Sequence, residues 1–257
     1  ITYAYLLGLL TYAEEHNMPQ SEITEILSCI EIFVFRRLIC GYPTNALLKM
    51  FATLHQQVLK NKKEEDSYYD VMVYLLENRK RTVVFPKDDE FRQSFIEKPV
   101  YLMRPKSRTY ILDRLENGNS KEKIDVINNV QKGELSVEHI MPQTLTQHWK
   151  EQLGSDYSRI HEEWLHTIAN LTLTGYNVQY SNRPYHEKKE DKNGFAASPL
   201  RLNKYISKFD KWTEAEMKER QTEMGKRALT VWPYPETSYK PAVKLDDEVS
   251  VYDEDFV

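Results

Sequence analysis

The chain has 257 residues, of which 40% are apolar and 29% charged, and its formal net charge is −4. This composition supports a folded core, excludes a disordered chain, and fits one large domain or two smaller ones. The only cysteines, Cys29 and Cys40, have neither metal-binding spacing nor the density of a disulfide scaffold, and no apolar run could span a bilayer. We therefore expect a cytoplasmic protein without membrane contact.

Apolar residues at helical spacing, with only 8 glycines in the chain, predict a helical region over residues 1–125. The chain begins without a Met or a signal peptide, so we expect a cut inside a longer protein and a missing N-terminal domain. The helices predicted in this region span residues 2–16, 21–40, 44–59, 68–79, 89–96 and 107–116.

The composition changes towards Gly133, and we place a second domain at 126–232. Its predicted strands are 135–140 and 168–174, the second being an alternating, threonine-rich segment. Residues 233–257 are acidic and are expected to form a flexible tail. The helices predicted in the second domain span 146–153, 158–166, 184–191, 198–208 and 214–232, with a further helix beginning near Asn177.

An acid and a histidine stand side by side where the first of these strands ends. Glu138 and His139 precede Pro142, and Asn177 should lie in the first turn of the helix after the second strand. Histidine is the usual general base near neutral pH, while carboxylate and amide oxygens suit Mg²⁺ or Mn²⁺. These residue types are what hydrolysis of a phosphodiester needs, because water must lose a proton and the transition state must be stabilised.

At these residues the chain resembles an HNH (ββα-metal) nuclease, and more narrowly the C-terminal part of the GmrSD-like, modification-dependent (type IV) restriction enzymes. The resemblance extends to the upstream segments Phe35–Gly41 and Phe85–Phe91. The segments that carry it most clearly are 138–143 (Glu-His-Ile-Met-Pro-Gln), 166–177 (His-Thr-Ile-Ala-Asn-Leu-Thr-Leu-Thr-Gly-Tyr-Asn), 181–189, 198–203 and 212–214.

The resemblance implies an α+β, mostly helical fold in which C-terminal helices wrap a ββα-metal finger. It implies that His139 is the general base, that Glu138 and Asn177 bind a divalent metal, Mg²⁺ or Mn²⁺, and that Asn170 is the structural asparagine of the catalytic motif. Many relatives have Asp in place of Glu138, which leaves open whether this side chain binds the metal directly. The cysteine pairs of zinc-binding relatives are missing, so no structural zinc is expected.

The expected substrate is DNA, foreign or modified, in restriction and phage defence, and the expected partner is an N-terminal domain that hydrolyses nucleotide or senses DNA. The alternatives are a non-catalytic DNA-binding or docking module and an RNA nuclease. His166 is either a residue that supports the catalytic base from outside the site or a core histidine that fixes the loop. The residues expected to contact DNA are Asn182 and Lys188, from the resemblance, and Arg201, Lys204 and Lys208, from their spacing along one predicted helix face.

Overall fold

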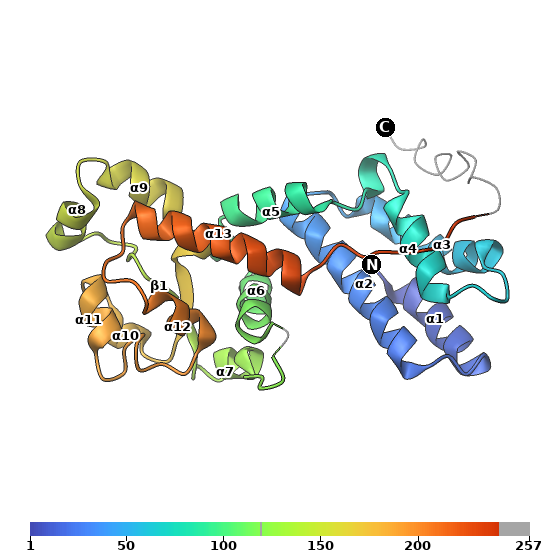
Figure 1. Ribbon diagram of the computed structural model, residues 1–257, viewed down its shortest axis with the longest axis horizontal. Helices are drawn as coiled ribbons and strands as arrows, with labels where there is room; N and C mark the ends of the chain where they lie inside the picture. Colours follow the sequence, from blue (N-terminus) through green and yellow to red (C-terminus); the bar gives the residue numbers. More distant parts are fainter. Residues whose placement is uncertain (119, 242–257) are drawn as a thin grey trace. The chain divides into compact units, whose positions relative to one another are not determined.

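The computed structural model describes residues 1–118 and 120–241 (Figure 1). The chain divides into two compact units: Ile1–Phe91 with the segment from Trp232 onward, and Arg92–Val231. The fold is mostly helical with a small sheet, as predicted. None of the described helices has the length and apolar content needed to cross a membrane.

The first unit is helical throughout its described elements. Apolar side chains from its helices, among them Phe33, Phe51 and Leu54, are fully buried in its core. The elements of this unit are α1 (Tyr3–Glu15), α2 (Gln20–Cys40), α3 (Asn45–Asn61), α4 (Tyr68–Glu77), the 3₁₀ turn η1 (Arg81–Val83) and the first residues of α5 (Asp88–Glu97).

Two buried arginines hold the loops of this unit. The Arg36 guanidinium donates to the backbone oxygens of Trp232 and Pro86, and Arg37 donates to Pro43, Thr82 and Val84. Buried carbonyl groups need such donors where no regular ladder supplies them. These arginines therefore have a structural role.

Part of the segment predicted as a tail is attached to the same unit. Thr237 donates to the backbone oxygen of Asp70, and the Tyr239 hydroxyl donates to Asn61 at 2.8 Å. Residues 242–257 lie outside the described part of the chain. The division into domains at 125 and 232 remains a prediction.

The second unit contains the sheet. Its elements are the end of α5, η2 (Val100–Leu102), α6 (Pro105–Asn117), α7 (Val126–Gln131), β1 (Ser136–His139), α8 (Gln147–Leu153), α9 (Tyr157–Trp164), η3 (Ile168–Asn170), β2 (Leu171–Thr174), α10 (Asn177–Tyr180), α11 (Tyr185–Glu190), α12 (Arg201–Ile206) and α13 (Glu214–Val231).

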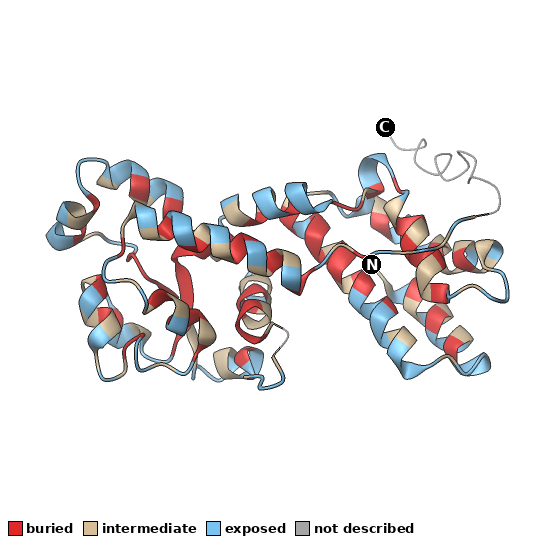
Figure 2. Ribbon diagram, viewed as in Figure 1, coloured by how far each residue is buried: buried red, intermediate tan, exposed pale blue. Residues whose placement is uncertain are grey.

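Strands β1 and β2 pair antiparallel, with Glu138 opposite Thr172 and His139 opposite Leu171. Helix α10 contacts β1, α12 contacts β2, and α13 packs on η3 and α6. Every residue of β2 is buried, as the red ribbon in Figure 2 shows. The apolar cluster beside the sheet is formed by Ile140, Met141, Trp149, Leu153, Ile160, Trp164, Ala169, Tyr180, Tyr185, Phe195, Ile206, Trp212 and Met217. Trp149 and Trp164 are thus core anchors of the loop that joins the strands.

Most predicted elements are present, and the differences concern short ones. The second strand begins only at Leu171, because residues 168–170 form a 3₁₀ turn that lets the Asn170 side chain bond to the chain after β1. Helix α12 ends at Ile206, two residues before the predicted end. Helix α7 lies where no helix was predicted, and its N-cap Asp125 accepts the Asn128 backbone N–H.

Candidate functional site

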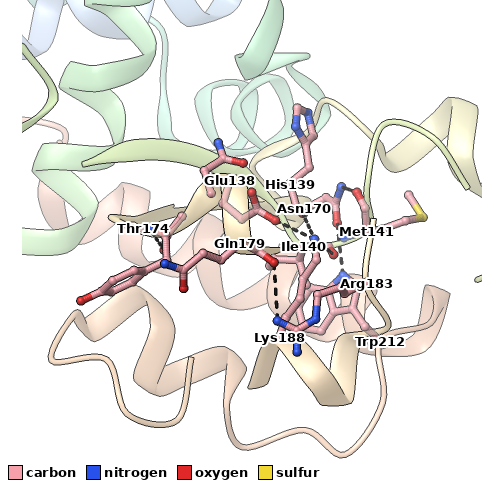
Figure 3. Close-up of polar contacts among 12 residues, drawn as sticks. Glu138, His139, Ile140, Met141, Asn170, Thr174, Gln179, Arg183, Lys188 and Trp212 are labelled. Atoms are coloured by element: carbon pink, nitrogen blue, oxygen red, sulfur yellow. Dashed lines mark hydrogen bonds and ion pairs between the residues drawn. The ribbon is translucent and has the colours of Figure 1, made fainter. Parts of the chain in front are cut away.

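Glu138 and His139 are neighbours on β1, and their side chains lie in different surroundings. Successive strand residues point to opposite faces of a sheet. In Figure 3 the His139 ring projects away from the side where Lys188 and Trp212 lie. The two side chains therefore face two different environments.

On the first side, Glu138 forms a buried ion pair with Lys188. Both side chains are at most 4% exposed, and Lys188 Nζ lies 2.6 Å from Glu138 Oε1. The same ammonium also donates to the backbone oxygens of His139 (3.0 Å) and Ile140 (3.2 Å). All three of its protons thus have acceptors, and Lys188 fixes α11 to the end of β1.

Burial shifts the pKa values of both partners towards the neutral forms. It raises the pKa of Glu138, with the Lys188 charge opposing the shift. It lowers the pKa of Lys188, with the Glu138 charge opposing that shift. The ion pair persists in this buried place because each charge and each ammonium proton has a close partner.

Asn170 ties the same end of β1 to the following loop. Its Oδ1 accepts the Met141 backbone N–H (2.8 Å) and the Trp212 indole N–H (3.2 Å). Its Nδ2 donates to the backbone oxygens of Met141 (2.9 Å) and Leu165 (3.1 Å). The side chain is fully buried, so its hydrogen-bonding capacity is used within the protein. This geometry fits the structural role that the resemblance implies.

On the second side, aromatic and cationic groups cover His139, which is 5% exposed. The Tyr101 ring centroid from η2 is 4.2 Å from that of His139, and His139 Nε2 lies 3.4 Å from His166 Nδ1. The Arg108 guanidinium from α6 stands 4.5 Å above the Tyr101 ring and donates to the Tyr101 backbone oxygen.

These surroundings keep His139 neutral. Burial lowers the pKa of His139 to about 3, and the charges of His166, Lys188 and Arg108 act in the same direction. The pKa of His166 is also lowered, first by burial and then by His161. A neutral imidazole can accept a proton, which a general base requires.

One nitrogen of His139 remains available for that purpose. Within residues 1–118 and 120–241, Nδ1 of His139 has no hydrogen-bond partner, whereas Nε2 faces His166. The residue as a whole is 5% exposed, so the ring is not completely closed off from solvent. An unpaired proton acceptor is therefore present at Nδ1 of a neutral His139.

The oxygen atoms predicted to hold a metal are partly committed. Asn177 Nδ2 donates to the Val137 backbone oxygen at 3.1 Å, which places the amide beside β1. Glu138 Oε2 and Asn177 Oδ1 have no hydrogen-bond partner in the described ranges. These two oxygens suit Mg²⁺ or Mn²⁺, which commonly uses one or two protein oxygens with phosphate and water.

The protein supplies few ligands beyond these two oxygens. No cluster of three or more His, Cys, Asp or Glu side chains suited to a metal is found among the described residues. A metal at this place would therefore depend on oxygens of the substrate and of water for most of its coordination.

The residues predicted to contact DNA differ in how free they are. Lys188 is fully buried, and the Arg201 guanidinium donates to Glu116, Ser120 and Glu122.

Lys204 is exposed on α12. The predicted stripe on one helix face is wrong beyond that point, because Lys208 follows the end of the helix and lies 5.4 Å over the Tyr205 ring. Asn182, after the left-handed Ser181, is half-buried.

The sequence interpretation missed Tyr101 and Arg108, which lie more than thirty residues before His139. Their signal is a basic segment with an aromatic residue, from Lys98 to Arg108, a pattern that often marks contact with nucleic acid. The interpretation also missed Arg220, whose buried guanidinium donates to the backbone oxygens of Ala169 and Leu171.

The chain was compared with protein families. The family described as GmrSD restriction endonucleases, C-terminal domain, matches residues 85–227, more than half of the chain. The match includes β1, β2 and every residue placed around His139 above. Comparison with curated proteins found no match. The chain therefore belongs to the GmrSD restriction endonuclease family, through the C-terminal domain of that family.

Proposed function

We propose that the chain is a metal-dependent endonuclease of the HNH type that cleaves foreign or modified DNA in defence against phage. The observation that carries this proposal is the unpaired Nδ1 of His139 at the end of β1. The element order β1, β2, α10 and membership in a restriction endonuclease family support it. An N-terminal domain would sense the DNA or hydrolyse nucleotide.

His139 would accept the proton of the water that attacks phosphorus. A pKa of about 3 leaves it neutral at pH 7 but makes it a weak base. The negative charge of a bound phosphodiester would raise that pKa, because an opposite charge favours the protonated imidazole. Burial of the ring gives such a charge a larger influence than it has in water.

The positive groups near His139 would bind the phosphate. Arg108 and Lys188 both act on the His139 ring as positive charges. Lys188 is committed to Glu138, so Arg108 is the cation on this side that a substrate could recruit. A field of one sign concentrates an anionic substrate at the site.

The divalent metal would be held by Glu138 Oε2 and Asn177 Oδ1. When bound, it would polarise the phosphate and stabilise the leaving oxygen. The ion pair with Lys188 would leave Oε2 as the free carboxylate oxygen, while Asn170 would hold the chain after β1 so that His139 keeps its place. The exposed Lys204 and Lys208, with Asn182, would contact the DNA backbone away from the reacting phosphate.

The test compares His139→Ala with the parent chain in plasmid nicking with Mg²⁺ or Mn²⁺. Loss of a general base should slow cleavage by about 10²- to 10⁴-fold. The matched control is His148→Ala, because His148 is an exposed histidine on α8 of the same unit. We expect this control to cut at the parent's rate, and a chelator to stop both. Equal rates for His139→Ala and the parent would refute the proposal.

Two further outcomes separate the alternatives. A parent chain that shifts DNA in a gel but never cleaves it would be a binding module. Preferential cleavage of RNA in a competition with DNA of the same sequence would make the chain an RNA nuclease with the same chemistry.

A further inference from the structure

His166 contacts the candidate base His139. His166 lies between α9 and η3 and is half-buried. Its Nδ1 lies 3.4 Å from His139 Nε2, which is a long distance for a hydrogen bond. Catalytic hydrogen bonds are often long before substrate is bound.

The backbone on both sides of His166 is fixed. Asn170 Nδ2 donates to the Leu165 oxygen at 3.1 Å, and the Tyr101 backbone N–H donates to the His166 oxygen at 3.1 Å. The next residue, Thr167, donates through its hydroxyl to the Trp164 oxygen. The position of the His166 side chain is therefore set by the same network that holds the end of β1.

The His166 ring is also held by stacking. It lies almost parallel to the Tyr101 ring, with an interplanar angle of 11° and centroids 5.5 Å apart. Arg108 covers the Tyr101 ring from α6. An aromatic stack of this kind orients a ring without using its nitrogen atoms. His166 Nδ1 is thus free to bond with His139.

We propose that His166 is a positioning residue: its Nδ1 accepts the Nε2–H of His139 and so holds His139 in the tautomer whose Nδ1 is unprotonated. The proposal deepens the proposed function and rests on it for the role of Nδ1 as base. The opposite arrangement, with His166 donating, would place the His139 proton on Nδ1, the nitrogen that is to act as the base. A neutral imidazole has one donor and one acceptor nitrogen, so the partner of one nitrogen decides the state of the other.

The experiment uses two substitutions that separate packing from hydrogen bonding. His166→Phe keeps an aromatic ring on Tyr101 but removes Nδ1, whereas His166→Asn loses the ring but keeps an acceptor near the position of Nδ1. The first readout is the ¹⁵N spectrum of the histidine rings in the full chain, with the His139 signals assigned by their loss in His139→Ala. This readout needs no cleavage.

We expect His139 in the parent to show an unprotonated Nδ1 and a protonated Nε2. In His166→Phe the two tautomers should be mixed, and in His166→Asn the parent's tautomer should be recovered. A protonated Nδ1 in the parent, or an unchanged tautomer in His166→Phe, would overturn the proposal.

The second readout is the steady-state rate of cleavage. His166→Phe should lower kcat by about tenfold to a hundredfold, as loss of an outer partner of a functional imidazole often does, with little change in KM and Tm. His166→Asn should restore most of kcat despite its poorer packing. A purely structural His166 would give the reverse order, since Phe packs better than Asn.

The two readouts distinguish this proposal from the function on which it rests. The expected tautomer in a chain that never cleaves nucleic acid would refute the nuclease proposal and leave the contact with His139 established. Cleavage that depends on His139, together with a tautomer indifferent to His166, would refute the positioning role alone.

Discussion

The two sides of β1 show how one short strand places neighbouring residues in different chemical states. On the Glu138 side, Lys188 and Asn170 have hydrogen-bond partners for their polar atoms and are fully buried. On the His139 side, one ring nitrogen is partnered by His166 and the other is not. The saturated side, formed by Lys188 and Asn170, holds the strand in place. The open atoms are His139 Nδ1 and Glu138 Oε2, where a ligand can gain a new bond.

The largest expected effect on stability comes from removing the ion pair between Glu138 and Lys188. Lys188→Met should lower the free energy of unfolding by about 3–5 kcal/mol, because it leaves the Glu138 carboxylate buried without a counter-charge. Denaturant unfolding measures this change. The control is the double variant Glu138→Gln with Lys188→Met, which removes both charges and should recover part of the loss. A single variant within about 0.5 kcal/mol of the parent, the range of an ordinary surface change, would contradict the assigned role of the ion pair.

The second prediction concerns the other anchor of that side. Asn170→Asp should lower the free energy of unfolding by about 2–6 kcal/mol, because two donated bonds to the Met141 and Leu165 oxygens become contacts between acceptors, each costing about 1–3 kcal/mol. Asn182→Asp is the matched control, since Asn182 is half-buried and its side chain has no partner among the described residues. Equal losses of stability from both substitutions would contradict the role of Asn170.

The third prediction uses pH to probe the open side. The pKa of His139 in the folded chain is about 3, below its usual value of 6.5. Between these two pH values the imidazole is therefore protonated in the unfolded chain and neutral in the folded chain. This contribution to stability is complete above pH 6.5 and is lost as the pH falls from 6.5 towards 3, by up to about 1.4 kcal/mol per pH unit.

The measurement is the unfolding free energy between pH 7 and pH 5 in the parent and in His139→Gln. The parent should lose stability more steeply than the variant. His148→Gln, at an exposed position, should keep the parent's slope. Parallel curves for the parent and His139→Gln would show that the imidazole is not held neutral by its surroundings.

The sequence predicted the long elements well for a physical reason. Helices such as α2 and α13 carry apolar residues at a regular spacing, and that spacing depends on local sequence alone. The end of β2 was predicted, but its start was not, because the turn at 168–170 is favoured by bonds of Asn170 to Met141. Such a tertiary bond leaves no local pattern.

The candidate site was predictable only in part for the same reason. Glu138, His139, Asn170 and Asn177 form a recognisable spaced motif, and the structure places all four around the end of β1. The ion pair of Glu138 with Lys188 joins residues fifty positions apart, and the ring of Tyr101 arrives from a separate element. No spacing rule predicts these contacts.

The smallest expected effect extends the comparison to the surface charges of α12. Arg201 belongs with the saturated groups, since its guanidinium donates to three neighbours and its backbone N–H donates to the Glu116 carboxylate. Lys204 belongs with the groups that are open to a ligand, because its side chain is exposed. Arg201→Gln should therefore lower the unfolding free energy by about 1.5–3 kcal/mol, the range for a hydrogen bond with a charged group, while Lys204→Gln should leave it unchanged.

The same two variants should differ in the opposite sense in DNA binding. Lys204→Gln should weaken binding and reduce its salt dependence by about one released counterion, since a phosphate contact contributes through ion release. Arg201→Gln, measured where it remains folded, should keep the parent's salt dependence. If Arg201→Gln alone reduced the salt dependence, the guanidinium would have to exchange its protein partners for phosphate, and its assignment to the saturated groups would be wrong.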